Sequence, residues 1–242
     1  MKKLIAVLCG VLALLVTAFP AMAIGWTEVD AADVKQMMEQ EDPLVIFPLS
    51  RIEFNDLHIV DSLNIPLGRL EEMLPPDRDR KLVFYCLGPK CTASPKAADR
   101  AIQLGYLNVY AFIGGLPAWV KAGYPTRTID PLSREQPQMI TVTELAERLQ
   151  KNPDTVVLDV RQPHDVAKGY INAPGRVTIP LDDLFSRRRE VPRGETLVIC
   201  CQKGKRAPTA ARYLLGKHFD NVVVLAGGVE SWKKAGYPVA ID

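Results

Sequence analysis

The sequence predicts an α/β fold made of two tandem domains, each with a mainly parallel central sheet flanked by helices. Short apolar runs rich in β-forming residues alternate with helical stretches along most of the chain, as in parallel sheets. A long internal repeat indicates that this pattern occurs twice. The length of 242 residues suits two domains of about 100 residues each.

The repeat is clearest in a segment rich in glycine and aromatic residues. Residues 114–125 (GGLPAWVKAGYP) recur as residues 227–238 (GGVESWKKAGYP), at a constant offset of 113 residues. The apolar runs 82–86 and 197–201 match instead at an offset of 115 residues. The loop that follows this strand is therefore two residues longer in the first copy than in the second.

The repeat sets the expected domain boundaries. The first domain is expected at residues 24–125 and the second at residues 139–242. Residues 126–138 between them are polar and contain two prolines, so they are expected to form an extended linker.

Each domain is expected to contain the same ordered elements. A Thr141-x-x-Glu144 pair has the spacing of a capping box and predicts the start of a helix. Buried strands are expected where short apolar runs occur, and helices where longer amphipathic stretches follow them. The strands expected are 44–47, 82–86, 109–112, 155–160, 197–201 and 222–225, and further helices are expected at 95–104, 116–122, 208–215 and 229–235.

The N-terminus has the pattern of a secretory signal peptide. Lys2 and Lys3 precede an apolar stretch, 4–19, and Ala21-Met22-Ala23 has the small-x-small pattern of a cleavage site. Residues 1–23 are therefore predicted to be a cleaved signal peptide, which implies export, into the periplasm in a bacterium. An uncleaved N-terminal membrane anchor is the alternative.

The charge of the exported chain argues against two classes of partner. The formal net charge is +2, and removing residues 1–23 removes two lysines and no acidic residue, which leaves a formal charge of zero. Without a global positive field, neither a nucleic acid nor, after signal cleavage, a membrane is an expected partner. Positive charge is instead concentrated locally, at Lys203, Lys205 and Arg206.

These cations lie in the loop that is the candidate site. Cys201 ends a predicted buried strand, and the short basic loop after it leads into the helix predicted at 208–215. Loop amides, the helix dipole and the cations all favour a thiolate and an anion beside it. Cys201 is thus the candidate nucleophile, and the substrate-binding candidates are Gln202, Lys203, Gly204, Lys205 and Arg206.

The ordered motifs of the second copy resemble the rhodanese family. They are Asp159-Val160-Arg161, Gly169-Tyr170-Ile171, Ile179-Pro180, the Cys-x-x-Gly-x-Arg loop from Cys201 and the Gly227-Gly228 segment with its Trp232. The resemblance implies two rhodanese-like domains and transfer of sulfane sulfur through a persulfide on Cys201. It also implies a small anionic donor such as thiosulfate and a thiol or cyanide acceptor. No cofactor and no metal ion is expected.

The first copy departs from this pattern. Residues 47–49 (FPL) stand where the family has Asp-Val-Arg, and the loop CLGPKC joins Cys86 to Cys91 with Lys90 as its one cation. Three interpretations remain open: a non-catalytic partner domain, a second active loop that uses Cys86, and a redox pair of Cys86 and Cys91. A metal site that combines these cysteines with His58 lacks the expected ligand spacing.

Two functions from different classes are therefore considered. The first is an exported thiosulfate sulfurtransferase-like enzyme acting through Cys201. The second is a sulfur-carrier, thiol-redox or protein-binding module that does not turn over thiosulfate, with a periplasmic thiol protein as partner. Phosphatase activity is disfavoured, because only four residues separate Cys201 from Arg206, one fewer than in a Cys-x5-Arg loop.

Overall fold

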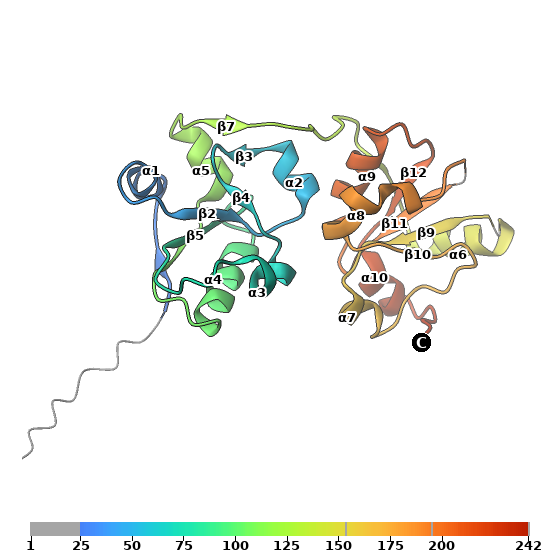
Figure 1. Ribbon diagram of the computed structural model, residues 1–242. Coiled ribbons are helices and arrows are strands. Elements are labelled where there is room, and N and C mark those ends of the chain that lie inside the picture. Colours follow the sequence, from blue (N-terminus) through green and yellow to red (C-terminus); the bar gives the residue numbers. More distant parts are fainter. Residues whose placement is uncertain (1–24, 153, 195, 242) are drawn as a thin grey trace, which may run out of the picture.

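The chain forms two α/β domains joined by a linker (Figure 1). The structure is a computed structural model that describes residues 25–152, 154–194 and 196–241. The predicted signal peptide at residues 1–23 lies outside the described residues. No helix within the described part of the chain is long and apolar enough to cross a membrane.

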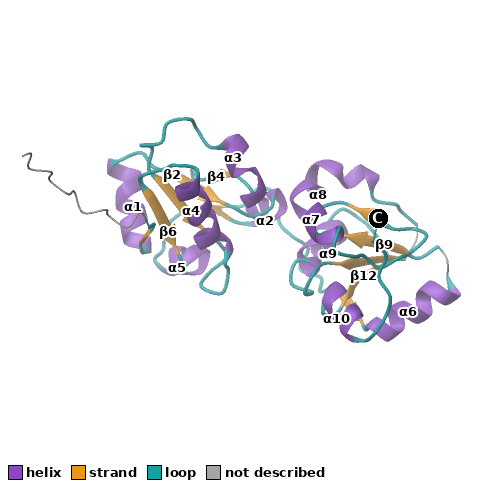
Figure 2. Ribbon diagram, turned by 90° about the horizontal axis from the view of Figure 1, so that it is seen from below, coloured by secondary structure: helices purple, strands orange, loops and turns teal. Residues whose placement is uncertain are grey.

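The first domain is built around a five-stranded parallel sheet in the order β1-β6-β5-β2-β4. Helices cover both faces of this sheet (Figure 2). Its elements are β1 (Thr27–Glu28), α1 (Ala31–Gln40), β2 (Leu44–Phe47), α2 (Arg51–Asp56), β3 (His58–Ile59), β4 (Leu63–Asn64), η1 (Leu67–Arg69), α3 (Leu70–Met73), β5 (Leu82–Tyr85), α4 (Ala93–Gln103), β6 (Val109–Phe112), α5 (Gly115–Lys121) and β7 (Thr126–Arg127).

The second domain repeats the arrangement with a five-stranded parallel sheet in the order β10-β9-β11-β12-β8. Its elements are β8 (Gln138–Ile140), α6 (Val142–Lys151), β9 (Val156–Asp159), α7 (Pro163–Val166), β10 (Val177–Thr178), α8 (Leu181–Arg187), η2 (Arg188–Glu190), β11 (Leu197–Cys200), α9 (Ala207–Leu215), β12 (Val222–Leu225) and α10 (Gly228–Lys234). The predicted α/β class with parallel central sheets is confirmed.

Most differences from the predicted elements are small shifts of their ends. The strands β2, β6 and β12 have the predicted bounds, whereas α4 begins two residues earlier than predicted. The ends of the predicted linker are not free coil. β7 pairs antiparallel with β3, and Gln138 pairs with Val223 as part of β8, because backbone N–H and C=O groups beside a sheet gain hydrogen bonds by joining it.

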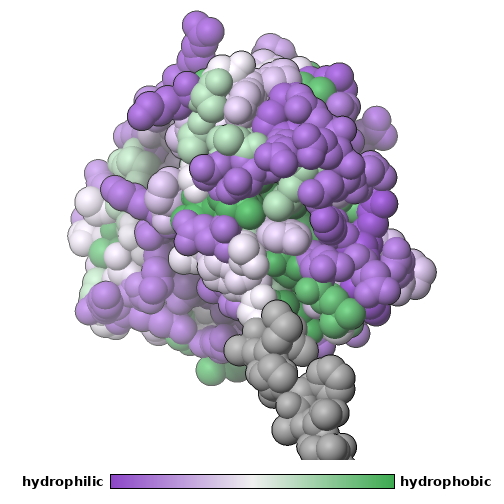
Figure 3. Space-filling view, turned by 90° about the vertical axis from the view of Figure 1, so that its left-hand side faces the viewer, coloured by the Kyte–Doolittle hydropathy of each residue, from purple (hydrophilic) through white to green (hydrophobic). Residues whose placement is uncertain are grey.

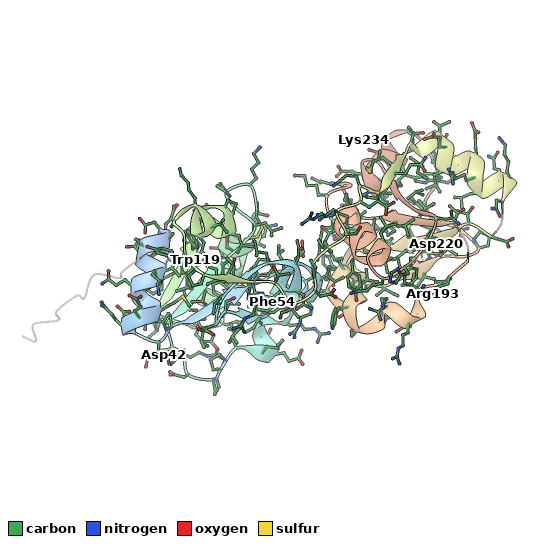
Figure 4. The ribbon with its side chains drawn as sticks, turned by 90° about the horizontal axis from the view of Figure 1, so that it is seen from above. Asp42, Phe54, Trp119, Arg193, Asp220 and Lys234 are labelled. Atoms are coloured by element: carbon green, nitrogen blue, oxygen red, sulfur yellow. A yellow bond between two sulfur atoms is a disulfide. The ribbon has the colours of Figure 1, made fainter. Side chains whose placement is uncertain are left out.

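The two domains share a packed interface. In the second domain's core, the side chain of Ile52 from α2 is 1% exposed and joins a cluster that otherwise comes from residues of the linker and the second domain. Helix α2 contacts both α8 and α9, and Figure 4 places Phe54, on α2, at the side of the first domain that faces the second. Burial of Ile52 therefore fixes one domain against the other.

The linker is bonded to both domains. Asp56 on α2 accepts a hydrogen bond from the Leu132 backbone N–H at 2.9 Å. On the other side, Lys217 forms an ion pair with Asp130 at 2.6 Å, and Arg212 donates to the carbonyl of Ser133 at 2.7 Å. These contacts hold the linker against the interface that Ile52 fills.

The end of the first domain that faces away from the second has a mixed surface. Figure 3 shows that hydrophilic residues cover most of this face, with hydrophobic residues scattered between them. Single exposed apolar side chains of this kind are normal for a protein surface. The cysteine loops of the two domains lie at the opposite side, toward the domain interface.

Candidate active site

The candidate nucleophile lies at the carboxyl end of the central strand β11. Cys201 follows this strand directly and is 3% exposed. Its Sγ accepts hydrogen bonds from the backbone N–H groups of Arg206 at 3.3 Å and Ala207 at 3.4 Å, at the start of α9. Both donors carry the positive end of the helix dipole, so they stabilise negative charge on the sulfur.

A glycine pair shapes the turn beneath the loop. The Cys201 carbonyl accepts the N–H of Val229 at 2.9 Å, and the Gln202 carbonyl accepts the N–H of Glu230 at 3.0 Å. Gly228 has φ +63°, and a Cβ there would lie 2.0 Å from the Cys201 carbonyl oxygen. Only glycine fits this approach, which explains why the Gly-Gly segment belongs with the cysteine loop.

The cations of the loop differ in their partners. Arg206 forms a 2.6 Å ion pair with Asp182 at the start of α8, and Lys203 lies 3.8 Å from Glu230. Lys205 has no ion pair within the part of the chain that the structure describes. Arg206 is therefore held by a carboxylate that sequence reasoning missed.

Asp182 connects the loop to a neighbouring segment. Its second carboxylate oxygen accepts a hydrogen bond from Gln162 at 2.6 Å, so one side chain fixes both Gln162 and Arg206. The one sequence signal for Asp182 was its place as an acidic residue in the first turn of the helix that follows Ile179-Pro180. Acidic residues are common there for helix-dipole reasons alone, so the signal did not identify a partner for Arg206.

A buried ion pair supports the other side of the loop. Arg161 and Asp159 are 3% and 1% exposed, and they pair at 2.6 Å with further hydrogen bonds between them. The Arg161 guanidinium also donates to the Gln202 Oε1 at 3.2 Å and to the Gly169 carbonyl at 3.1 Å. Arg161 therefore positions Gln202, whose side chain faces this network.

These residues enclose a pocket of about 300 Å³, called here the Cys201 pocket. Its lining consists of residues 160–162, Asp165, Cys201, Gln202, Lys203, Lys205 and Arg206. The neighbouring Cys200 is fully buried, and burial raises its thiol pKa well above the ordinary value. The structure thus places one cysteine, Cys201, in a cation-lined pocket and leaves Cys200 in the core as a neutral thiol.

The geometry agrees with the comparison of the chain with known families. The rhodanese-like domain family matches it twice, over residues 30–122 and 141–235. The chain belongs to the rhodanese-like family. This confirms the resemblance inferred from the motifs, and it makes both domains of the chain sulfurtransferase-like rhodanese domains.

Relatives of this rhodanese-like protein match one or both domains. A sulfurtransferase from Allochromatium vinosum is 32% identical over 95 residues, which are 39% of this chain and 87% of that protein. Among solved structures, a rhodanese-related protein from Thermoplasma volcanium matches at 28% identity and a TM-score of 0.40, over 43% of this chain and 99% of the other. Thiosulfate sulfurtransferase from Pseudomonas aeruginosa matches at 23% identity and a TM-score of 0.41, over 89% of this chain and 43% of the other.

In the first rhodanese-like domain, Cys86 takes the place of Cys201. The N–H of Leu116 donates to the Cys86 carbonyl at 2.9 Å, as that of Val229 does to Cys201. The sulfur of Cys86 is bonded to Cys91 in a disulfide. His58 lies apart from this chemistry, because its Nδ1 is 2.8 Å from the Phe54 carbonyl oxygen and its ring stacks on Phe54.

The loops of the two domains meet at a second and larger pocket of about 640 Å³, called here the interdomain pocket. Leu49, Glu53 and the loop residues 87–93 line it from the first domain, and Lys205 and Arg206 line it from the second. Lys205 and Arg206 therefore line both pockets. Sequence reasoning treated each loop separately and missed this juxtaposition, which depends on how the domains pack.

Glu53 gives the interdomain pocket a pH-dependent element. Burial raises the pKa of its carboxyl above the ordinary 4.5, although hydrogen bonds from Ser50 and the charge of Arg206 partly oppose the rise. Its Oε2 accepts hydrogen bonds from the Ser50 hydroxyl at 2.7 Å and the Ser50 N–H at 3.1 Å. The folded state therefore binds a proton at Glu53 more tightly than the unfolded state does.

Glu53→Gln is expected to change the pH dependence of stability. A raised folded-state pKa contributes stability that is fully present below 4.5 and is lost as the pH rises through the folded-state value. The unfolding free energy of the wild type should therefore fall relative to that of Glu53→Gln as the pH rises above 4.5. Urea unfolding of both chains at several pH values measures this difference, and an opposite trend contradicts the raised pKa.

Proposed function

We propose that the protein is an exported sulfurtransferase that moves sulfane sulfur from thiosulfate, or a similar small anionic donor, to a thiol or cyanide acceptor through a persulfide on Cys201. The observation that carries this proposal is the pair of backbone N–H donors, from Arg206 and Ala207, on the Cys201 sulfur. Two N–H groups at a helix N-terminus that point at one sulfur stabilise negative charge on it, both when the sulfur attacks and when it leaves.

The first step loads the cysteine. The Cys201 thiolate attacks the outer sulfur of thiosulfate, a new S–S bond forms, and the original S–S bond breaks as sulfite leaves with its electron pair. Donor and leaving group are both anions, and Lys203 and Lys205 line the pocket in which they would bind. Positive charge that is already in place stabilises the developing sulfite without reorganisation.

The second step transfers the sulfur from the Cys201 persulfide to the acceptor. An acceptor thiolate or cyanide attacks the outer sulfur of the persulfide, and Cys201 leaves as a thiolate. The N–H groups of Arg206 and Ala207 stabilise this leaving group as they stabilised the nucleophile. No histidine lines the pocket among the described residues, so the proposal assigns activation of the thiol to the amides and the local positive charge.

A thiol-redox function is the second candidate, and the Cys86–Cys91 disulfide favours it. In this alternative the chain exchanges thiols with a periplasmic protein and does not turn over thiosulfate. The two candidates predict different products after exposure to the donor. A sulfurtransferase gains sulfur on Cys201 from thiosulfate alone, whereas a pure redox module gains none.

The test is to map which cysteine gains a sulfur. The reduced chain, residues 24–242, is treated with thiosulfate and analysed by peptide mass spectrometry. We expect a mass increase of one sulfur atom on the peptide that contains Cys201, and its loss in Cys201→Ser. Cys200→Ala is the matched control, because it removes the neighbouring buried thiol and should leave the adduct in place. Absence of any adduct on Cys201 in the wild type would falsify the proposal.

The export part of the proposal rests on residues 1–23. Protein expressed in a bacterial host with its full N-terminus is expected in the periplasmic fraction, with Ile24 as its first residue. Edman sequencing of that fraction checks this cleavage. A membrane fraction that retains Lys2 and Lys3 would indicate the uncleaved anchor instead.

A further inference from the structure

We propose that Cys86 and Cys91 form a redox-active pair that takes the sulfane sulfur from Cys201 and releases it as sulfide. The disulfide found in the structure is then the spent form of the pair. This inference rests on the proposed function, because the sulfur must first reach Cys201. It assigns to the first domain a reductive activity coupled to sulfur transfer in the second.

The interdomain pocket is the first observation that supports this role. Cys91 lines it from the first domain, and Lys205 and Arg206 line it from the second. The same two cations line the Cys201 pocket. Lys205 and Arg206 of the Cys201 loop thus separate the pocket of Cys201 from the pocket that Cys91 borders. The packing of Ile52 fixes the two domains that carry these loops against each other.

The two cysteines of the pair differ in exposure. Cys86 is 1% exposed at the end of β5, whereas Cys91 is partly exposed and borders the pocket. A thiol or persulfide that enters the pocket therefore meets Cys91 first. This assigns Cys91 as the attacking sulfur and Cys86 as the resolving sulfur, the usual division of roles in exchanging cysteine pairs.

The surroundings of Cys91 carry positive charge. Cys91 lies two residues before α4, an 11-residue helix whose N-cap, Thr92, makes no side-chain capping hydrogen bond. The first-turn amides of α4 consequently have no side-chain acceptor there, and Lys90 adds a positive charge beside Cys91. The positive end of a helix dipole and a neighbouring lysine both favour an anion beside Cys91.

A purely structural role explains this disulfide less well. The bond closes a loop with a sequence separation of only five residues and joins no elements that are distant in the chain. Constraint of the unfolded chain by a disulfide is weaker for short loops than for long ones. The bond instead lies at the end of β5, and the equivalent strand end in the second domain carries the candidate nucleophile.

The proposed chemistry balances in two steps. The reduced Cys91 thiolate attacks the outer sulfur of the Cys201 persulfide, so Cys201 leaves as a thiolate and Cys91 becomes a persulfide. The Cys86 thiolate then attacks the Cys91 Sγ, forms the disulfide and expels hydrosulfide with the electron pair. The sulfane sulfur is reduced by two electrons, and the two thiols are oxidised. A dithiol reductant, acting by thiol–disulfide exchange, returns the pair to its reduced form.

A single-turnover experiment without any added acceptor tests the inference. The full mature chain is reduced with dithiothreitol, freed of reductant under anaerobic conditions and mixed with thiosulfate. We expect the wild type to release stoichiometric sulfide and to form the Cys86–Cys91 disulfide. Cys91→Ser should lose sulfide release and retain the persulfide on Cys201. Cys86→Ser should also release no sulfide and should carry a persulfide on Cys91.

Thiocyanate formation with cyanide provides the control, because it reports on Cys201 without needing the first-domain pair. Both serine variants are expected to keep this activity, which shows that they are folded. A wild type that keeps its Cys201 persulfide and releases no sulfide overturns the inference but leaves the proposed function standing. Sulfide release by Cys91→Ser at the wild-type level also overturns it. If no variant forms either a persulfide or thiocyanate, the proposed function itself fails.

Discussion

Cys201→Ser is expected to lower the rate of thiocyanate formation from thiosulfate and cyanide by about a thousandfold or more, as is common when a covalent nucleophile is removed. A serine hydroxyl is a far weaker nucleophile than a thiolate at neutral pH, and its oxygen cannot hold the sulfane sulfur as a persulfide. The hydrogen bonds from Arg206 and Ala207 would remain available to the hydroxyl. The loss should therefore appear in activity with little change in thermal stability.

Two controls separate loss of the nucleophile from loss of the fold. Cys200→Ala removes a thiol that is fully buried, so it should cost some stability and leave the turnover rate near that of the wild type. The double variant Cys86→Ser/Cys91→Ser should keep thiocyanate formation, because cyanide replaces the first-domain acceptor. Full activity in Cys201→Ser together with loss in the double variant would move the active cysteine to the first domain.

Local sequence patterns were sufficient to predict the fold class. The repeat of the Gly-Gly…Trp…Gly-Tyr-Pro segment, combined with the apolar runs at residues 44–47 and 222–225, located strands that the structure reproduces. Such runs are informative because a parallel strand is buried on both faces and must be apolar throughout. The position of Cys201 at a strand end followed from the same pattern.

The contacts that complete the candidate site were not predictable in this way. Asp182 reaches Arg206 from α8, which lies in a segment 24 residues away in the sequence. The interdomain pocket depends on Ile52, whose burial in the other domain's core has no signal in the local sequence. Pairings of this kind are set by tertiary packing, and a single sequence without homologues carries no record of them.

The alternatives left open for the first domain illustrate the same limit. The spacing of Cys86 and Cys91 was compatible with a redox pair, an active loop or an inert partner domain. The structure adds the disulfide, the different exposure of the two sulfurs and the shared cations of the two pockets. Cys86 and Cys201 follow the equivalent strand in the two copies of the repeat. They nevertheless differ chemically, because Cys86 is bonded to Cys91 and Cys201 is a free thiol.

Gly228→Ala is expected to lower the free energy of unfolding of the second domain by about 3–4 kcal/mol, of which about 1–2 kcal/mol is the cost of a left-handed backbone for a residue with a Cβ. The remainder comes from overlap, because the new Cβ would lie 2.0 Å from the Cys201 carbonyl oxygen. That oxygen cannot retreat without breaking its hydrogen bond to the Val229 N–H. The Cys201 loop must therefore shift, and thiocyanate formation should be lost with it.

Gly236→Ala is the matched control for this prediction. Gly236 lies just beyond the same helix, α10, and has φ +81°, but a Cβ there would meet no atom within 4 Å. It should therefore show the left-handed cost of about 1–2 kcal/mol alone and should keep its activity. Urea unfolding and thiocyanate assays on both variants measure the difference. Equal destabilisation with retained activity in both would show that the close approach of Gly228 to the Cys201 carbonyl does not hold the loop in place. A larger loss of stability and of thiocyanate formation in Gly228→Ala alone would instead show that the Gly-Gly turn of the repeat holds the Cys201 loop in its active geometry.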